Sequence, residues 1–282
     1  MNQPLVSVIV TTKNNEETLG ACLASITRQT YDDLELIVVD NCSADATMAI
    51  ARRYTKLVFK YGPERSAQRN YGVRQASGEY VLIIDSDMEL NERVVEACVA
   101  AAQTPPAAGA VIIPEESFGE GFWARCKNLE RSFYVGIDAI EAARFFAKDL
   151  YTRVGGYNET MTGGEDWDLT YRARAVTRVA RVSEFIRHNE GRVRFARSAG
   201  KMYYYAQHAA AYFAENPTPS VLRNQSGPLA RYKLFFSRPG TLLRHPIVAL
   251  GMLTFKTAEY TAAGLGYMRR TNYVPAGGER ES

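Results

Sequence analysis

Cysteines are few in this 282-residue chain, and none is spaced to form a metal site. The four are Cys22, Cys42, Cys98 and Cys126, without a C-x-x-C pair or a metal-finger spacing among them. This argues against a zinc-finger module and predicts free thiols in a reducing compartment. The N-terminus also lacks the basic region, apolar run and cleavage site of a signal peptide, so we expect a cytoplasmic protein.

Two phosphate-binding fingerprints are missing as well. The chain contains neither G-x-x-x-x-G-K-[ST] nor G-x-G-x-x-G, so neither a P-loop nor a dinucleotide fingerprint applies. Any phosphate must then be held by a metal ion and by basic side chains. The net charge of +3 is too small to indicate a nucleic-acid partner. With 46% hydrophobic and 23% charged residues, the composition is that of a globular protein.

Apolar strands alternate with amphipathic helices over the first 114 residues. This order predicts an α/β fold with a mostly parallel central sheet and helices on both faces. The expected strands are Leu5–Thr12, Leu34–Val39, Leu57–Phe59, Tyr80–Ile84 and Ala110–Ile113, and the expected helices are Glu16–Gln29, Ala44–Tyr54, Arg65–Ala76 and Asn91–Gln103. After Pro114 we expect helices at Gly119–Tyr134 and Asp166–Ala175 and strands at Ala143–Ala147, Val179–Val182 and Phe185–Arg187.

The stretch Gly78–Leu90 is the most informative part of the sequence. Its apolar run Tyr80–Ile84 is typical of a strand buried on both faces, and it ends in Asp85 and Asp87. Open α/β sheets bind ligands at the carboxyl ends of their strands. Two carboxylates at that point suit a divalent cation held against a diphosphate. A strand followed by a simple acidic turn or helix cap is the alternative.

Other polar residues follow neighbouring strands and should meet the same edge of the sheet. They are Thr11, Lys13 and Glu16 after the first strand and Asp40 after the second. Arg65 and Arg69 begin the helix upstream of the central strand. A guanidinium can bind a phosphate with two hydrogen bonds, so both are candidates for contact with a diphosphate, or else solvated surface residues.

The order of these motifs resembles the family 2 glycosyltransferases, which have the GT-A fold. The resemblance covers roughly residues 4–190 and rests on Ser7–Glu16, Glu35–Thr47, Arg65–Val73 and Gly78–Asp87. It implies a Rossmann-like central sheet and transfer of a sugar from a nucleotide diphosphate sugar, with UDP as the expected nucleotide. The family usually has an aromatic residue at position 13 and Asp at position 41, where this chain has Lys13 and Asn41.

The resemblance also implies roles on the donor side. Thr11 and Lys13 would line the nucleotide pocket, with Glu16 where the family has a Glu after its first strand. Asp40 would accept a hydrogen bond from the base, Asp85 would face the ribose and Arg69 the diphosphate. The expected cofactor is Mn²⁺ or Mg²⁺. Its implied ligands are Asp87, Glu89 and His188, although His188 is equally well read as a structural residue.

Gly163–Leu169 places acidic residues at an expected helix start, where the helix dipole favours negative charge. Capping of the helix alone explains that pattern. A transfer to a hydroxyl needs a base within reach of the acceptor, and the resemblance assigns this role to Asp166. Glu165 and Trp167 would then lie on the acceptor side. A single in-line displacement with this base predicts inversion at the anomeric carbon.

The last part of the chain differs in composition. Aromatic and cationic residues mix in Arg231–Phe236, as in interfacial segments, and the apolar stretch Leu242–Met268 is interrupted by charges. Its uninterrupted core, Ile247–Phe255, is far shorter than the ~20 residues of a membrane span. We therefore expect peripheral contact with the inner face of the cell membrane and a lipid-linked glycan as acceptor. A helix packed on the catalytic domain and an oligomer interface are the alternatives.

The sequence therefore predicts a catalytic domain over residues 1–194 and a helical extension over residues 195–282. The donor half of the domain would cover about residues 1–114 and the acceptor half about residues 115–194. The leading function is an inverting, metal-dependent glycosyltransferase. A sugar-phosphate nucleotidyltransferase uses a similar sheet but normally carries a Gly-rich loop after its first strand, which this chain lacks. A non-catalytic sugar- or lipid-binding scaffold is the third alternative.

Overall fold

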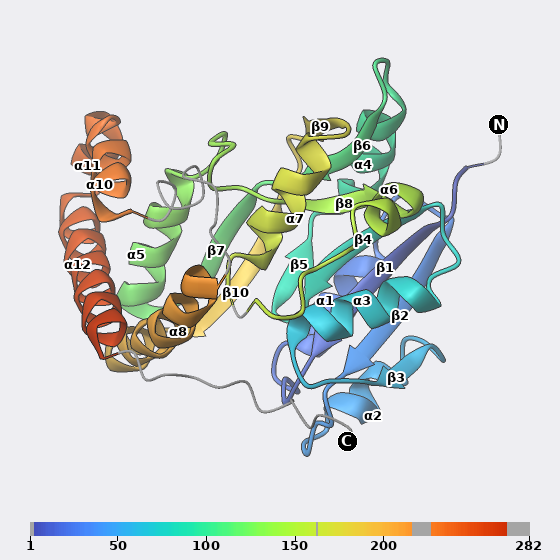
Figure 1. Cartoon of the computed structure of the whole chain (residues 1–282), viewed down its shortest axis with the longest axis horizontal. Coiled ribbons are helices and arrows are strands. Elements are labelled where there is room, and N and C mark those ends of the chain that lie inside the picture. The colour runs from blue at the N-terminus through green and yellow to red at the C-terminus, as the bar shows by residue number, and fades with distance from the viewer. Residues whose placement is uncertain (1–2, 162, 216–226, 270–282) are drawn as a thin grey trace.

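The computed structural model describes residues 3–161, 163–215 and 227–269, with side chains in the helix that ends at Glu215 described only as far as Gln207. Residues 216–226 and 270–282, which belong to the predicted helical extension, lie outside this range. The chain forms a central α/β layer with further helices gathered at one side, beyond the second sheet (Figure 1).

A seven-stranded sheet forms the centre of the molecule, in the order β3-β2-β1-β4-β8-β6-β9. Its paired neighbours run parallel except that β8 is antiparallel to both β4 and β6. This confirms the predicted α/β class and mostly parallel sheet. The strands are β1 (Val6–Thr12), β2 (Leu34–Asp40), β3 (Val58–Lys60), β4 (Tyr80–Asp85), β6 (Ala108–Ile112), β8 (Ala143–Ala147) and β9 (Arg178–Arg181).

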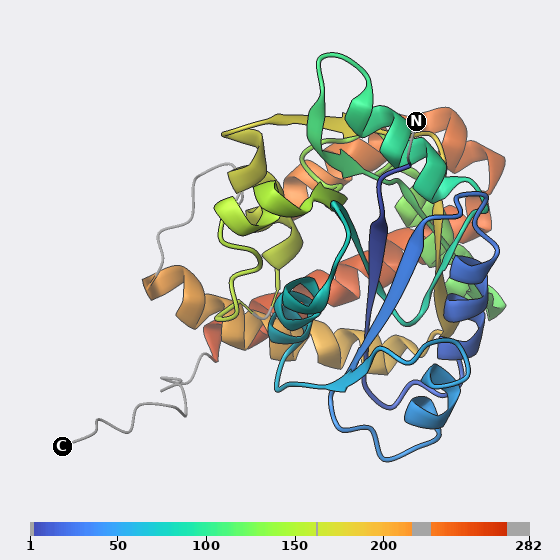
Figure 2. The same ribbon diagram turned by 90° about the vertical axis from the view of Figure 1, so that its right-hand side faces the viewer.

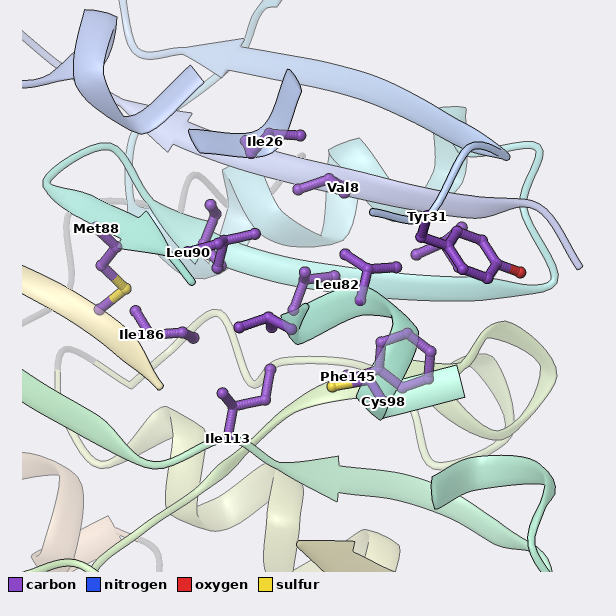
Figure 3. Packing of buried hydrophobic residues seen from close by; sticks show 14 of the residues in the cluster. Val8, Ile26, Tyr31, Leu82, Met88, Leu90, Cys98, Ile113, Phe145 and Ile186 are labelled. Atoms are coloured by element: carbon purple, nitrogen blue, oxygen red, sulfur yellow. The ribbon is translucent and has the colours of Figure 1, made fainter. Parts of the chain in front are cut away.

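Helices cover both faces of this sheet because its strands are apolar on both sides. Val8 and Leu82 pack with helices on one face (Figure 3), whereas Ile9 packs on the other. The first face is covered by α1 (Leu19–Thr27), α2 (Thr47–Ala51) and α4 (Val94–Gln103), and the second by α3 (Arg65–Gln75), α6 (Lys148–Arg153) and α7 (Glu165–Arg174). The observed helices α1, α2 and α4 are shorter than the ranges predicted for them.

Helix α3 lies unusually close to the sheet. A Cβ atom added at Gly72 would collide with Ile9 and come within 3.2 Å of Val39. Only glycine therefore permits this separation between α3 and strands β1 and β2.

A second sheet, β5-β10-β7, adjoins the carboxyl end of β4. It consists of β5 (Met88–Leu90), β7 (Glu115–Glu120) and β10 (Ile186–Arg192). The sequence predicted only part of β10 and neither of its partners. β5 has only three residues and β7 is mostly polar, and Gly119 belongs to β7 although we placed it in the following helix. That helix, α5, runs over Gly121–Ser132.

The described part of the chain after Phe195 contains only helices, as predicted. They are α8 (Phe195–Glu215), α10 (Pro228–Phe236), α11 (Pro239–Arg244) and α12 (Pro246–Met268). Helix α12 packs against α8 and α5, and Phe235 and Met252 share a buried cluster with Phe133. In Figure 2 these helices lie behind the central sheet. The extension therefore shares a core with α5. This packing agrees with the alternative in which a C-terminal helix packs on the catalytic domain.

Candidate active site

The predicted donor-side residues meet because three neighbouring strands end at the same edge. In the sheet register Thr11 lies between Val39 and Asp85, and Thr12 lies beside Asp40. The Thr11 hydroxyl donates a hydrogen bond to Asp85 Oδ1 at 3.2 Å. This places the ends of β1, β2 and β4 side by side, as the alternation of strands and helices predicted.

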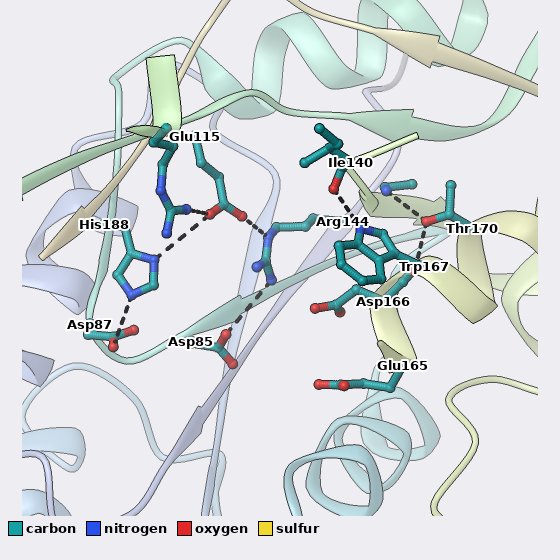
Figure 4. Close-up of polar contacts among 12 residues, drawn as sticks. Asp85, Asp87, Glu115, Ile140, Arg144, Glu165, Asp166, Trp167, Thr170 and His188 are labelled. Carbon is teal, nitrogen blue, oxygen red and sulfur yellow. Dashed lines mark hydrogen bonds and ion pairs between the residues drawn. The ribbon is translucent and has the colours of Figure 1, made fainter. Parts of the chain in front are cut away.

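A cleft of about 340 Å³ opens between this edge, the second sheet and α7. Six of the predicted site residues line it: Arg65, Asp85, Glu165, Asp166, Trp167 and His188. Arg69 and Asp87 contact lining residues without being part of the lining. Thr11, Lys13, Glu16, Asp40 and Glu89 are not among the lining residues. Figure 4 shows Asp85 and Asp87 on one side of this space and Glu165 and Asp166 on the other.

Arg69 joins the two sides of the cleft. Its side chain is fully buried, and Nη2 donates to both oxygens of Asp85 at 2.8 and 3.1 Å. Nη1 donates to Glu165 at 3.3 Å and to Asp166 at 3.1 Å. The resemblance implied that Arg69 faces the diphosphate, but here its guanidinium is held by three carboxylates. Its position therefore suits it to fix those carboxylates relative to one another.

Asp166 lies in the first turn of α7, behind Gly164. Gly164 has φ +81°, a left-handed conformation that suits glycine and turns the chain into the helix. Oδ1 of Asp166 accepts hydrogen bonds from the Tyr157 hydroxyl at 2.9 Å and from Arg69. In the contacts of the described residues both bonds reach Oδ1, which leaves Oδ2 available to a hydroxyl in the cleft.

The residues beside Asp166 line the same wall. Glu165 is almost fully buried, and both burial and the charge of Asp166 raise its pKa. Trp167 Nε1 donates to the Ile140 carbonyl at 2.5 Å, which fixes the indole ring along the cleft. The acidic pair is thus more than a helix cap, since both carboxyl groups take part in the ionic network of the cleft.

His188 lies across the cleft on β10. Its Nε2 is 3.2 Å from Asp87 Oδ2, and its Nδ1 is 3.8 Å from Glu115. Burial alone would lower the pKa of His188, but the hydrogen bond to Asp87 and the nearby carboxylate of Glu115 outweigh it and raise that pKa to about 9. Because β5 and β10 pair Met88 with His188 and Glu89 with Arg187, Glu89 lies on the opposite face of this sheet from His188.

Asp87 and His188 offer a carboxylate oxygen and an imidazole nitrogen at one point, a donor set that suits Mn²⁺. Within residues 3–161, 163–215 and 227–269, no group of three or more His, Cys, Asp or Glu side chains is arranged to hold a metal ion. A metal site would therefore use Asp87 and His188, and its remaining ligands would come from outside the protein. Glu89, the third implied ligand, lies on the opposite face of the sheet from His188.

The remaining donor-side residues lie in the loops after β1 and β2. Lys13 and Glu16 are exposed, and Glu16 accepts a hydrogen bond from the Ala46 amide at 2.9 Å. Asp40 is buried and accepts hydrogen bonds from the amide and the hydroxyl of Ser43, the first at 2.8 Å. Glu16 and Asp40 therefore hold the two loops in shape, and whether they also contact a nucleotide stays a prediction.

A model of the family described as Glycosyl transferase family 2 matches residues 7–155, which is more than half of the chain. The chain belongs to this family. It is therefore a glycosyltransferase that takes its sugar from a nucleotide-sugar donor, and the recognition made from its motifs is confirmed.

Two named relatives show how far the similarity extends. A PGL/p-HBAD biosynthesis glycosyltransferase of Mycobacterium bovis is 31% identical over 184 residues, covering 61% of this chain and 70% of the relative. The poly(ribitol-phosphate) beta-N-acetylglucosaminyltransferase TarS of Staphylococcus aureus is 36% identical over 105 residues, covering 33% of this chain and 18% of TarS.

Two solved structures share the fold. The Pyrobaculum calidifontis mannosyltransferase PcManGT, in complex with GDP-Man and Mn²⁺, has a TM-score of 0.60 and 20% identity, covering 95% of this chain and 88% of its own. TarS residues 1–349, in complex with UDP-GlcNAc, has a TM-score of 0.58 and 20% identity, covering 93% and 83%. These similarities confirm the GT-A fold.

Sequence reasoning missed Arg144 and Glu115, which are among the charged residues that line this glycosyltransferase cleft. Arg144 on β8 is almost fully buried, and its Nε donates to Glu115 at 2.6 Å while Nη1 lies 3.9 Å from Asp85. Arg131 also pairs with Glu115. Both signals were present in the sequence: Arg144 interrupts the apolar strand Ala143–Ala147, and Glu115 follows an expected strand just as Asp85 does.

The ion pairs of Asp85 predict sensitivity to acid. Burial would raise the pKa of Asp85, but Arg69, Arg144 and Arg65 hold it well below its usual range. The unfolded value is about 3.9, so this stabilisation is present above about pH 4 and is lost as the pH falls toward the folded pKa. Denaturant unfolding at a series of pH values should show stability decreasing below about pH 4. In an Asp85→Asn variant, the free energy of unfolding should depend less on pH in this range. An equal pH dependence in both proteins would show that Asp85 is not the source of the acid sensitivity.

No helix within the described part of the chain is long and apolar enough to cross a membrane.

Proposed function

We propose that this glycosyltransferase inverts the anomeric carbon and depends on a divalent cation. The proposed donor is a UDP-sugar, and the proposed acceptor is a hydroxyl group of a lipid-linked glycan, reached at the inner, cytoplasmic face of the cell membrane. The observation that carries the proposal is the cleft in which Asp166 faces Asp85 and His188, with Asp87 hydrogen-bonded to His188 beside it.

Asp166 is the proposed base. Tyr157 and Arg69 hold Oδ1, so the carboxylate is fixed in orientation before an acceptor arrives. Asp166 removes the proton of the acceptor hydroxyl as the hydroxyl oxygen bonds to the anomeric carbon. The bond from that carbon to the diphosphate oxygen breaks, and its electron pair leaves with the nucleoside diphosphate. Attack from the face opposite the leaving group inverts the anomeric carbon.

The donor side of the cleft supplies charge for the leaving group. Asp87 and His188 would hold Mn²⁺ or Mg²⁺, which neutralises charge on the diphosphate when bound. Arg65 is half exposed, and its ion-pair partner Glu165 also contacts Arg69. The Arg65 side chain can therefore turn toward a phosphate while Glu165 keeps a cationic partner. Arg69 keeps Asp85, Glu165 and Asp166 at fixed distances while the donor binds. TarS with UDP-GlcNAc and PcManGT with GDP-Man and Mn²⁺ are consistent with such a donor and cation.

Release of nucleoside diphosphate from a panel of nucleotide sugars tests this function. We expect turnover with Mn²⁺ or Mg²⁺ and none after chelation, with an inverted anomeric configuration of the product by NMR. Removing a residue that only hydrogen-bonds to a metal ligand typically lowers metal affinity about 10- to 100-fold. Asp87→Ala removes a proposed ligand itself, so it should weaken activation by Mn²⁺ at least as much. Asp33→Ala, an exposed residue before β2, is the matched control.

Each contrary result points to a different protein. Release of pyrophosphate would indicate a sugar-phosphate nucleotidyltransferase. Tight binding of a nucleotide sugar without turnover would indicate a binding scaffold. Turnover that resists chelation, or a retained anomeric configuration, would contradict the metal-dependent inverting mechanism.

A further inference from the structure

Helix α12 is oriented with its charges inward. Its two charged residues, Lys256 and Glu259, lie 2.7 Å apart and face α5, where Lys256 also pairs with Glu130 at 2.6 Å and Glu259 with Lys127 at 3.2 Å. Surface helices normally place charged residues toward water and apolar residues toward the core. The reversal leaves the outer face of α12 without a charged side chain.

This outer face consists of Ile247, Leu250, Thr254, Thr261 and Leu265, and 74% of Ile247 and 67% of Leu250 are exposed. The threonine hydroxyls donate to carbonyls of their own helix, Thr254 to Leu250 and Thr261 to Thr257, each at 2.9 Å. Because their hydroxyls are satisfied within the helix, these threonines can present methyl groups outward. The outer face is thus suited to an apolar environment.

The preceding helix α11 extends the apolar surface. Leu243 is 76% exposed and lies four residues before Ile247, and α11 contacts both α10 and α12. Helix α10 exposes Phe236 and Leu229 as well. Isolated exposed apolar residues are normal, but a set concentrated on consecutive helices marks an interaction surface.

The exposed charges on α10, on α11 and on the turn between these helices have one sign. The sequence from Pro228 to Ala258 contains no Asp or Glu, and it exposes Lys233, Arg238 and Arg244. A groove of about 370 Å³ between α5, α11 and the start of α12 has cationic and polar side chains in its lining. They are Arg125, Arg244, His245, Asn128, Ser132 and Thr241, and the apolar residues Leu129 and Val248 complete the lining. Two guanidinium groups among hydroxyl and amide side chains suit a phosphate group.

We propose that α11 and the outer face of α12 dock on an anionic lipid bilayer. Leu243, Ile247 and Leu250 enter the boundary between headgroups and acyl chains, and the groove beside them holds a lipid phosphate. A second copy of the chain would bring the same cations against each other, whereas an anionic bilayer complements them. The inference rests on the proposed lipid-linked acceptor, and it names the surface that brings the enzyme to the membrane.

Co-sedimentation with vesicles tests the docking surface with the whole 282-residue chain. We expect binding to vesicles of phosphatidylglycerol and phosphatidylcholine, weakening as salt rises, and little binding to phosphatidylcholine alone. Arg238→Glu/Arg244→Glu should lower vesicle affinity at least about tenfold. Ile247→Ser should lower it at least about fivefold, since it removes an apolar side chain that enters the bilayer.

Two exposed sites away from this surface provide matched controls. Arg52→Glu/Arg53→Glu, at the end of α2, makes the same change of charge, and Val176→Ser, after α7, removes an exposed apolar side chain. Both should bind vesicles as the unmodified enzyme does. Point changes are preferred to truncation because removing α12 would also remove Met252 and Phe255 from the core.

Release of nucleoside diphosphate in vesicle-free solution separates this inference from the proposed function. The surface variants should release nucleoside diphosphate at the unmodified rate, because none of the changed residues lines the active-site cleft. Normal release without binding to anionic vesicles, or vesicle binding unaffected by either surface change, would overturn the docking surface alone. A concentration-dependent dimer abolished by Ile247→Ser, without vesicle binding, would assign the face to a second copy and overturn the proposal. Vesicle binding without any turnover would instead contradict the proposed function.

Discussion

Replacing Asp166 by Asn is expected to lower sugar transfer by about 100- to 10,000-fold, the usual contribution of a general base. Donor affinity should change little. Asn has the same shape, and its carbonyl oxygen can still accept the hydrogen bond from Tyr157, so the cleft keeps its form. Arg69 retains Asp85 and Glu165 as partners. The loss should therefore appear in the transfer step alone.

Titration of the donor by calorimetry and measurement of transfer to an acceptor separate the two effects. Asp168→Asn is the matched control, because Asp168 lies two residues further along α7 and pairs with Arg172 at 2.6 Å. That pair is partly exposed and lies outside the cleft lining, so its loss should leave transfer close to normal. An equal loss of donor binding and transfer in Asp166→Asn would mean that Asp166 maintains the structure and is not the base.

Replacing Arg69 by Met is expected to destabilise the protein by about 3–5 kcal/mol, as happens when one partner of a buried ionic group is removed. Arg69 is fully buried against three carboxylates, and its guanidinium carbon lies 4.8 Å from the centre of the Tyr157 ring. Methionine would fill much of the space but leave Asp85, Glu165 and Asp166 close together without a shared cation. Activity should be lost as well, because the base is no longer held.

Arg65→Met is the control for this change. Arg65 lies one turn earlier on α3, is half exposed and contacts Glu165 at 3.3 Å. Its removal should cost less than about 1 kcal/mol. Denaturant unfolding of both variants measures the difference. Similar losses in the two proteins would show that Arg69 is not the cation on which the carboxylates depend.

The donor-side edge could be predicted from the sequence because its information is local. Tyr80–Ile84 is apolar and ends in Asp85, and the strands before it follow the same rule. Parallel strands bring their carboxyl ends to one edge, so the alternation of strands and helices predicts that Thr11 and Asp85 lie at the same edge of the sheet. The structure adds that the two residues are direct neighbours in the sheet. The position of Asp166 needed the family resemblance, since a helix cap explains its sequence pattern equally well.

The rest depends on contacts between distant parts of the chain. Tyr157 reaches Asp166 across a loop, and Arg144 meets Glu115 because β8 runs antiparallel beside β6, an arrangement that no local pattern specifies. The sequence identified Arg69 as a cation near phosphate, but the three carboxylates that hold it are separated from it by 16, 96 and 97 positions. The orientation of the Lys256 and Glu259 side chains toward the protein interior likewise depends on the position of α5.

The short distance between α3 and the sheet has a consequence for how this active site can vary. Arg69 is three residues from Gly72 on the same helix. A larger residue at Gly72 would collide with Ile9, crowd Val39 and push α3 away from the sheet. Such a shift would withdraw the guanidinium from Asp85, Glu165 and Asp166 together. Substitutions in the loops around the cleft can therefore change substrate specificity. The packing of α3 against the sheet cannot vary in this way, because it fixes the position of Arg69.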